Sequence, residues 1–232
     1  MSRALASRGF TVAAIDYRHA PRFTFPAQLD DVRRSLALLC DSAASWGINP
    51  TRIALLGRSA GGHLAELAAF MPGGPRVRAV VGIYVPFDLV RGYRELPDPD
   101  PIDVRSALRG FLGGTPDDMM ARYRAASPSS YVRAGLPSVL LVYGARDHVV
   151  KPAFNRAAAA ALRGAGVRVV QVEVPWAEHG FDMVPAGVGA QLTFAVVTQF
   201  LSRELGPMVD VRARAFSAAE RDRARSRRGR LP

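Results

Sequence analysis

The chain has 232 residues, of which 49% are hydrophobic, and a mean hydropathy of +0.05, values typical of one globular α/β domain and not of a disordered chain. The net charge of +11 comes almost entirely from arginines scattered singly along the sequence, which indicates a compositional bias rather than a nucleic-acid-binding stripe. A single cysteine, Cys40, excludes an intrachain disulfide and a cysteine-based metal cluster. The sequence contains neither a membrane-spanning run nor a secretion signal, which predicts a cytoplasmic location.

The first half of the chain predicts two strands and two helices in alternation. Residues 10–18 (FTVAAIDYR) are β-branched and apolar, and they precede a turn-prone stretch, so we expect a buried strand. Residues 27–47 place apolar side chains three and four positions apart, the spacing of an amphipathic helix. A second buried strand is expected over residues 51–57 and a second helix over residues 60–70.

The second half continues the alternation. We expect strands over residues 76–89, 137–147 and 167–174, and helices over residues 155–166 and 189–205. Strands that alternate with helices form βαβ units, which give a mostly parallel sheet with helices on both faces. The predicted fold class is therefore α/β.

Two segments depart from this alternation within a predicted domain of residues 1–206. The insertion at about residues 91–136 is rich in proline and glycine, which favours loops and short helices; it is expected to cover the carboxyl ends of the strands as a small cap, or to be a passive surface excursion. Residues 207–232 hold eight arginines and three acidic residues with few large apolar side chains. This composition predicts a solvated, disordered or loosely helical tail.

The stretch ALLGRSAGGHLAEL places a G-x-S-x-G motif between a predicted strand and a predicted helix. This is the context of a nucleophile elbow, in which a sharp turn exposes the hydroxyl of Ser59. Gly57 and Gly61 are expected at the two positions where side chains would collide. The backbone N–H of Ala60, the residue after the serine, is a candidate donor to an oxyanion.

A serine hydroxyl becomes a nucleophile when a histidine takes its proton and a carboxylate orients that histidine. Asp147 lies at the carboxyl end of the predicted strand 137–147, and His179 lies in the loop after the predicted strand 167–174. Both would emerge at carboxyl ends of parallel strands, at the same edge of the sheet as Ser59. Ser59, Asp147 and His179 are therefore the expected catalytic set.

Other titratable residues are less well placed. Asp88 is the strongest alternative acid because it also ends a strand, whereas Glu178 and Asp182 flank His179 too closely in sequence to support its ring. The alternative bases are disfavoured: His148 is adjacent to Asp147, His63 lies on the helix after the elbow and His19 lies in the loop after the first predicted strand.

The segments GRSAGGHLA, GARDHVV and AEHGFD, with AAIDYRHAPRFTFPAQLDD, occur in consistent order from about residue 4 to residue 205. Together they resemble the α/β-hydrolase esterases related to hormone-sensitive lipase and to the feruloyl and xylan esterases (BD-FAE-like). The resemblance implies an acyl-serine mechanism in which Ser59 attacks an ester carbonyl, His179 carries the proton to the leaving alcohol and Asp147 orients His179. It implies a small-molecule ester as substrate. The histidines and acids show no metal-ligand spacing beyond these three residues, so we expect no cofactor or metal, and the composition predicts no nucleic-acid or membrane partner.

The sequence departs from this family at its beginning. The chain starts at what resembles the end of the family's first helix, and it lacks the family's N-terminal strands and the strand that carries an HGGG oxyanion loop. In the family that last strand lies between the counterparts of residues 10–18 and 51–57. The two flanking strands could pair directly, another chain could fill the gap by self-association through an unpaired edge, or the sequence could be an incomplete product of a longer gene.

Three alternative functions remain open from the sequence. The chain could be a non-catalytic or fragmentary hydrolase-fold remnant. It could also be a serine peptidase of the prolyl oligopeptidase type, which shares the elbow and the order of the three residues. The arginine-rich tail could bind nucleic acid, although it lacks interleaved aromatic residues.

Overall fold

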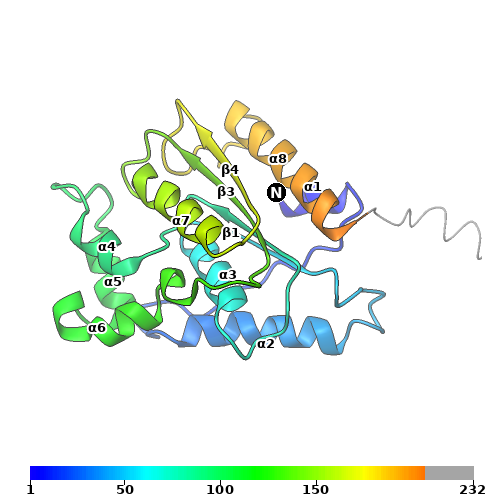
Figure 1. Cartoon of the computed structure of the whole chain (residues 1–232), viewed down its shortest axis with the longest axis horizontal. Coiled ribbons are helices and arrows are strands. Elements are labelled where there is room, and N and C mark those ends of the chain that lie inside the picture. The colour runs from blue at the N-terminus through cyan, green and yellow to red at the C-terminus, as the bar shows by residue number, and fades with distance from the viewer. Residues whose placement is uncertain (207–232) are drawn as a thin grey trace, which may run out of the picture.

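The computed structural model describes residues 1–206, so the predicted tail of residues 207–232 lies outside the described part of the chain. Its centre is a four-stranded sheet, entirely parallel, in the order β1-β2-β3-β4 (Figure 1). The strands are β1 (Ala54–Arg58), β2 (Ala79–Ile83), β3 (Ser138–Gly144) and β4 (Val169–Val174). Four of the five predicted strands are thus confirmed, each somewhat shorter than its apolar run.

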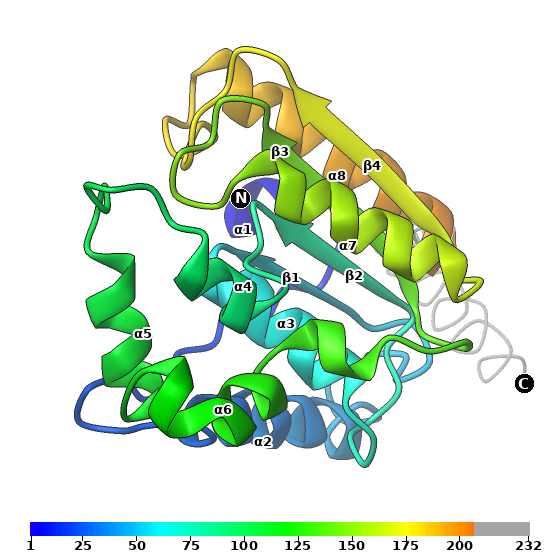
Figure 2. The same ribbon diagram turned by 60° about the vertical axis from the view of Figure 1, so that its left-hand side comes forward.

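Helices cover both faces of the sheet, as predicted. α3 (Ala60–Phe70) and α7 (Pro152–Gly164) lie on one face, and α1 (Ser2–Ala6) and α8 (Val188–Leu205) lie on the other (Figure 2). α2 (Ala27–Asp41) packs on α3 and ends six residues before the predicted boundary, because residues 42–47 form successive turns. All five residues of β2 are buried, so the core is centred on the middle of the sheet.

The insertion after β2 forms short helices and no strand. These are α4 (Leu89–Arg94), α5 (Val104–Leu112), α6 (Pro116–Ala125) and the 3-10 helix η1 (Pro128–Tyr131). Their apolar side chains join those of α2 and α3 in a second buried cluster. This cluster ties the insertion to the helical layer in front of the sheet (Figure 2). That the insertion acts as a cap over the site stays a prediction.

The prediction of a strand over residues 10–18 is wrong. This segment is irregular, Val12 and Ile15 are 36% and 44% exposed, and residues 11–17 make no backbone–backbone hydrogen bond within residues 1–206. A strand is defined by its ladder to a neighbour, and in the described residues no strand lies between this segment and the outer edge of β1. Direct pairing with β1, one of the expected outcomes, therefore does not occur.

The turn from β1 into α3 is a close approach of two backbones. A Cβ atom on Gly57 would lie 2.3 Å from the carbonyl carbon and oxygen of Gly61, and one on Gly62 would lie 2.6 Å from Val85 Cγ2. A Cβ atom on Gly61 itself would meet nothing within 4 Å. The expectation for Gly57 agrees with this packing. The expectation for Gly61 is wrong, because Gly61 contributes its backbone to the contact and Gly62 is the second position that excludes a side chain.

Glu66 brings a carboxyl group to the buried side of α3. It is 0% exposed, and neither of its oxygens has a hydrogen-bond partner. Its side chain lies over Gly82 of β2, where a Cβ atom would come within 2.8 Å of Oε1. Burial without a partner raises the pKa of Glu66 from its ordinary value of 4.5 to about 8. The folded chain therefore holds this group protonated at neutral pH.

The packing at the elbow predicts opposite results for two neighbouring glycines. Gly57→Ala forces β1 and α3 apart, and we expect it to lower Tm by more than about 10 °C or to prevent folding. Gly61→Ala adds a methyl group into open space in a helical turn, and we expect a Tm within about 3 °C of the wild type. Thermal unfolding followed by circular dichroism measures both. Equal losses in the two variants would contradict the close approach described here.

Glu66 predicts a pH dependence of stability. The unfolded carboxyl is ionised above about pH 5, whereas the folded one keeps its proton until the pH passes about 8, so stability from this group is lost as the pH rises through the folded pKa. We expect the wild-type Tm to fall by about 5 °C more between pH 6 and pH 9 than the Tm of Glu66→Gln. Glu95→Gln, which removes an exposed carboxyl, should keep the wild-type slope. Parallel slopes for wild type and Glu66→Gln would refute the assignment.

Candidate active site

The structure brings Ser59, Asp147 and His179 together at the carboxyl ends of the strands. Ser59 lies in the β1–α3 turn, Asp147 in the loop after β3 and His179 in the loop after β4. His179 Nε2 lies 3.1 Å from Ser59 Oγ, and His179 Nδ1 lies 2.8 Å from Asp147 Oδ2. These residues are 88 and 32 positions apart in sequence, and the common edge of a parallel sheet accounts for their meeting.

Ser59 has a backbone conformation rare for a residue with a side chain. Its φ is 46° and its ψ is −120°, and the left-handed φ is what turns the chain sharply from strand into helix. The turn is fixed by two hydrogen bonds: the Ser59 N–H donates to the Ile83 carbonyl (2.8 Å), and the His63 N–H donates to the Ser59 carbonyl (2.9 Å). The hydroxyl is thereby presented to His179.

Asp147 is held rigidly. Its side chain is 0% exposed, and its Oδ1 accepts hydrogen bonds from the backbone N–H groups of Val149 (2.9 Å) and Val150 (2.8 Å). Oδ2 is left to accept the Nδ1–H of His179. With Nδ1 donating, Nε2 of the neutral ring carries the lone pair and can accept the serine proton.

The loop that carries His179 crosses β3 at another glycine. A Cβ atom on Gly144 would lie 2.1 Å from the Ala177 carbonyl oxygen, so only glycine permits this crossing. The Arg146 N–H donates to the same carbonyl at 3.0 Å. This contact fixes the height of the imidazole above the sheet, and the sequence motifs gave no sign of it.

Ala60 begins α3, and within residues 1–206 its backbone N–H has no acceptor. The first N–H groups of a helix lack intrahelical partners, and they lie at the positive end of the helix dipole. An oxygen that gains negative charge beside Ser59 would find a donor here. This agrees with the place expected for Ala60 in an oxyanion hole, but its role stays a prediction.

The alternative bases are engaged elsewhere. His63 is buried, its Nε2 lies 2.6 Å from the Ala126 carbonyl oxygen, and burial lowers its pKa to about 4. His148 Nδ1 lies 2.9 Å from the Glu178 carboxylate at the surface. His19 is exposed, with its ring nitrogen 3.4 Å from the carboxylate of Asp16.

Asp88, the alternative acid, has a structural role. Its side chain accepts a hydrogen bond from the Arg91 N–H at 3.0 Å and so caps the amino terminus of α4. It makes no hydrogen bond with any histidine of the described residues. The carboxylate that meets His179 is that of Asp147.

Sequence reasoning missed a polar cluster of Arg58, Tyr84 and Asp182 beside the three candidate catalytic residues. Asp182, which lies too close to His179 in sequence to support its ring, accepts hydrogen bonds from Arg58 (2.7 Å) and from the Tyr84 hydroxyl (2.8 Å). The Tyr84 ring lies against the ring of His179, with the centroids 4.5 Å apart. An arginine inside the G-x-S-x-G motif was the available signal, because a charge at that position needs a counterion.

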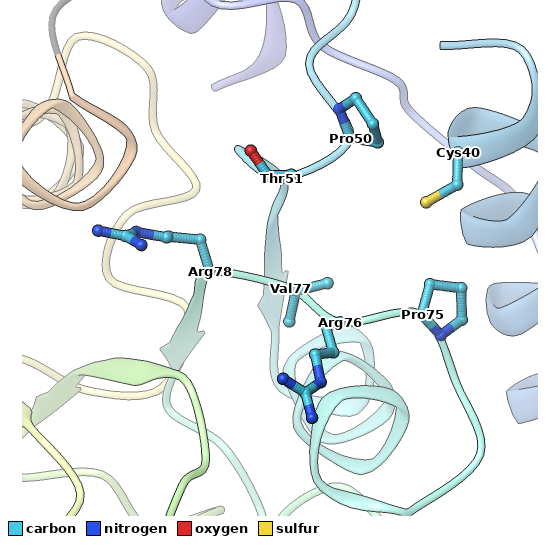
Figure 3. A pocket seen from close by; sticks show the side chains of 7 residues that line it. All are labelled: Cys40, Pro50, Thr51, Pro75, Arg76, Val77 and Arg78. Carbon is cyan, nitrogen blue, oxygen red and sulfur yellow. The ribbon is translucent and has the colours of Figure 1, made fainter.

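A pocket of about 390 Å³ lies away from these residues. Residues from the end of α2 and from the loops that lead into β1 and β2 line it (Figure 3): Cys40, Pro50, Thr51, Pro75, Arg76, Val77 and Arg78. It is at the amino-terminal end of the sheet, opposite to Ser59, and has no part in the candidate site. Within residues 1–206 we find no cluster of His, Cys, Asp and Glu side chains that could bind a metal ion. The helices of this part of the chain include none with the length and hydropathy of a transmembrane segment.

Comparisons with known proteins give the same fold and family. A model of the BD-FAE family matches residues 1–162. The chain is 33% identical to the esterase LipQ of Mycobacterium tuberculosis, over 87% of this chain and 49% of that protein, and 32% identical to the probable carboxylic ester hydrolase LipM of the same organism, over 89% and 52%. It thus spans about half the length of these curated relatives.

Solved esterase structures superpose on the chain. An esterase of Pyrobaculum calidifontis matches with a TM-score of 0.76 and 26% identity, covering 87% of this chain and 69% of that one. Esterase LipW of Mycobacterium marinum matches with a TM-score of 0.70 and 28% identity, covering 83% and 62%. The parallel sheet, the elbow and these matches establish an α/β-hydrolase fold, and the chain belongs to the BD-FAE family.

Proposed function

We propose that this chain is a serine hydrolase that cleaves carboxylic esters through an acyl-serine intermediate. The observation that carries the proposal is the continuous hydrogen-bonded series from Ser59 Oγ through the His179 ring to the buried carboxylate of Asp147. In this arrangement Ser59 is the nucleophile, His179 the general base and acid, and Asp147 the group that orients and stabilises the imidazolium.

In the acylation step, His179 Nε2 takes the proton of Ser59 Oγ while Oγ bonds to the carbonyl carbon of the ester. The electron pair of the C=O bond moves to its oxygen, for which the Ala60 N–H is the proposed donor. When the tetrahedral intermediate collapses, the bond to the alcohol oxygen breaks and the alcohol leaves with the proton from His179.

In the deacylation step, water replaces the alcohol. His179 removes one proton from water as its oxygen attacks the acyl carbon, and the bond from Ser59 Oγ to that carbon then breaks. The proton returns to Ser59 and the carboxylic acid leaves. The two steps consume one water, release one alcohol and one acid, and draw on no other reactant.

The relatives support esters over the alternatives. Both mycobacterial relatives are named as ester hydrolases, and the two superposed structures are named as esterases. These names favour an esterase over a peptidase of the prolyl oligopeptidase type. The assembled triad favours a catalytic chain over a remnant without activity, since a remnant would have no need to keep an imidazole within hydrogen-bonding distance of the serine. Cytoplasmic location and lack of a nucleic-acid partner stay predictions.

Ala60 supplies a single backbone donor in this proposal. Loss of one oxyanion donor commonly costs about 10²- to 10³-fold in rate, so we expect the purified 232-residue chain to hydrolyse esters slowly. A slow, Ser59-dependent rate is the signature of the proposed site.

The test is hydrolysis of p-nitrophenyl acetate and butyrate by wild type, Ser59→Ala and Asp147→Asn. We expect Ser59→Ala to lower kcat by at least about 10³-fold, because the nucleophile is absent, and Asp147→Asn to lower it by about 10²- to 10⁴-fold, because the ring of His179 loses its orientation. Labelling with a fluorophosphonate should add mass at Ser59 in wild type and add none in Ser59→Ala. Equal rates in wild type and Ser59→Ala would overturn the proposal.

A further inference from the structure

Asp182 links the same two segments that the triad must bring together. It follows His179 by three residues in the loop after β4, and Arg58, its partner, directly precedes Ser59 at the end of β1. Arg58 Nε donates a hydrogen bond to Asp182 Oδ2 at 2.7 Å, and Arg58 Nη2 forms an ion pair with the same oxygen at 2.7 Å. The ion pair therefore connects the end of β1 to the loop after β4, the same two segments that the hydrogen bond between Ser59 and His179 connects.

The second oxygen of Asp182 extends this link to the imidazole. Asp182 Oδ1 accepts the Tyr84 hydroxyl at 2.8 Å, and the Tyr84 ring lies 4.5 Å, centroid to centroid, from the His179 ring at an angle of 55°. A ring held at this distance limits the tilt of His179 on one side. Asp182 is thus connected to His179 in two ways: both residues lie in the loop after β4, and Tyr84 contacts both of them.

The backbone of Tyr84 is strained where this contact requires it. Its φ is 44°, in the left-handed region, which is unfavourable for a residue with a side chain. The Tyr84 N–H donates to the Val142 carbonyl at 2.7 Å, and the preceding carbonyl, of Ile83, accepts the Ser59 N–H. Tyr84 is therefore fixed to the sheet on one side and to the elbow on the other.

The charges of this cluster are matched, and the carboxylate is withdrawn from solvent. The Asp182 side chain is 0% exposed and that of Arg58 is 33% exposed. Burial is the largest single influence on the pKa of Arg58 and lowers it, but the hydrogen bond to Asp182, the charge of Asp182 and the contact with Tyr84 together outweigh burial, and the pKa of Arg58 rises. Burial and hydrogen bonding to Asp182 also raise the pKa of the Tyr84 hydroxyl, which stays a donor.

We propose that Asp182 is a positioning residue that sets the approach of His179 to Ser59, acting through Arg58 on the nucleophile and through Tyr84 on the imidazole. This inference rests on the proposed esterase function. In a proton transfer, a displacement of about 1 Å can cost about 10²-fold in rate, so the cluster controls the chemical step without touching substrate. Its loss should lower kcat and leave KM nearly unchanged.

The experiment measures kcat per active site, with the concentration of competent sites obtained by fluorophosphonate titration. For Asp182→Asn we expect a fall of about 10- to 100-fold in kcat per titrated site and a KM within about 3-fold of wild type. Tyr84→Phe, which keeps the ring and removes the hydroxyl, should lower kcat by about 3- to 10-fold. Arg58→Lys keeps the charge and should retain more activity than Arg58→Met.

A matched control lies elsewhere on the sheet. Glu173 of β4 accepts hydrogen bonds from the Tyr143 hydroxyl (3.1 Å) and from Arg156 Nε (2.8 Å), so it repeats the tyrosine–carboxylate–arginine arrangement without contacting the triad. Glu173→Gln should lower Tm and leave kcat per titrated site unchanged. A purely structural role for Asp182 would give the same result: fewer competent sites, each with the wild-type rate.

The outcomes separate the two proposals. A wild-type rate that does not depend on Ser59 overturns the proposed function. A Ser59-dependent wild type whose kcat per titrated site is unchanged in Asp182→Asn overturns the positioning role alone. If Asp182→Asn does not fold, Tyr84→Phe decides: an unchanged kcat per titrated site in that variant also overturns the positioning role.

Discussion

Two close approaches of backbone to backbone determine where the candidate site can form. Gly57 lets β1 pass against the start of α3, and Gly144 lets the loop after β4 cross the end of β3. At each point a single methyl group would clash with backbone atoms of the other element and force the two apart. The serine and the histidine reach each other because both crossings are made by glycine.

Three buried carboxyl groups near the sheet illustrate different solutions to the same physical problem. Asp147 is satisfied by two backbone N–H groups and the imidazole, and Asp182 by a guanidinium and a phenol. Glu66 has no partner and keeps its proton. Burial of an ionised group is unfavourable without compensation, which is why the carboxyl of Glu66, alone among these three in having no partner, has a raised pKa.

The alternation of apolar runs and helical periodicity was sufficient to predict four strands, the main helices and the three residues that meet at the carboxyl edge. It failed for residues 10–18, because an apolar run forms a strand only when a neighbour supplies a ladder. It also failed for Gly61, since the G-x-S-x-G motif does not indicate which glycine must lack a side chain and which glycine contributes only backbone atoms to the contact. The role of Tyr84 depends on a left-handed φ and a ring contact, neither of which has a sequence pattern.

The unpartnered carboxyl under α3 also affects calorimetry. Between the pKa of Glu66 in the unfolded chain and its value in the folded one, folding takes up a proton, and unfolding near neutral pH returns it to the solution. The heat absorbed on unfolding then includes the heat of protonating whatever buffer is present. Two buffers of the same pH but different ionisation enthalpies would report different unfolding enthalpies for this chain at the same midpoint temperature.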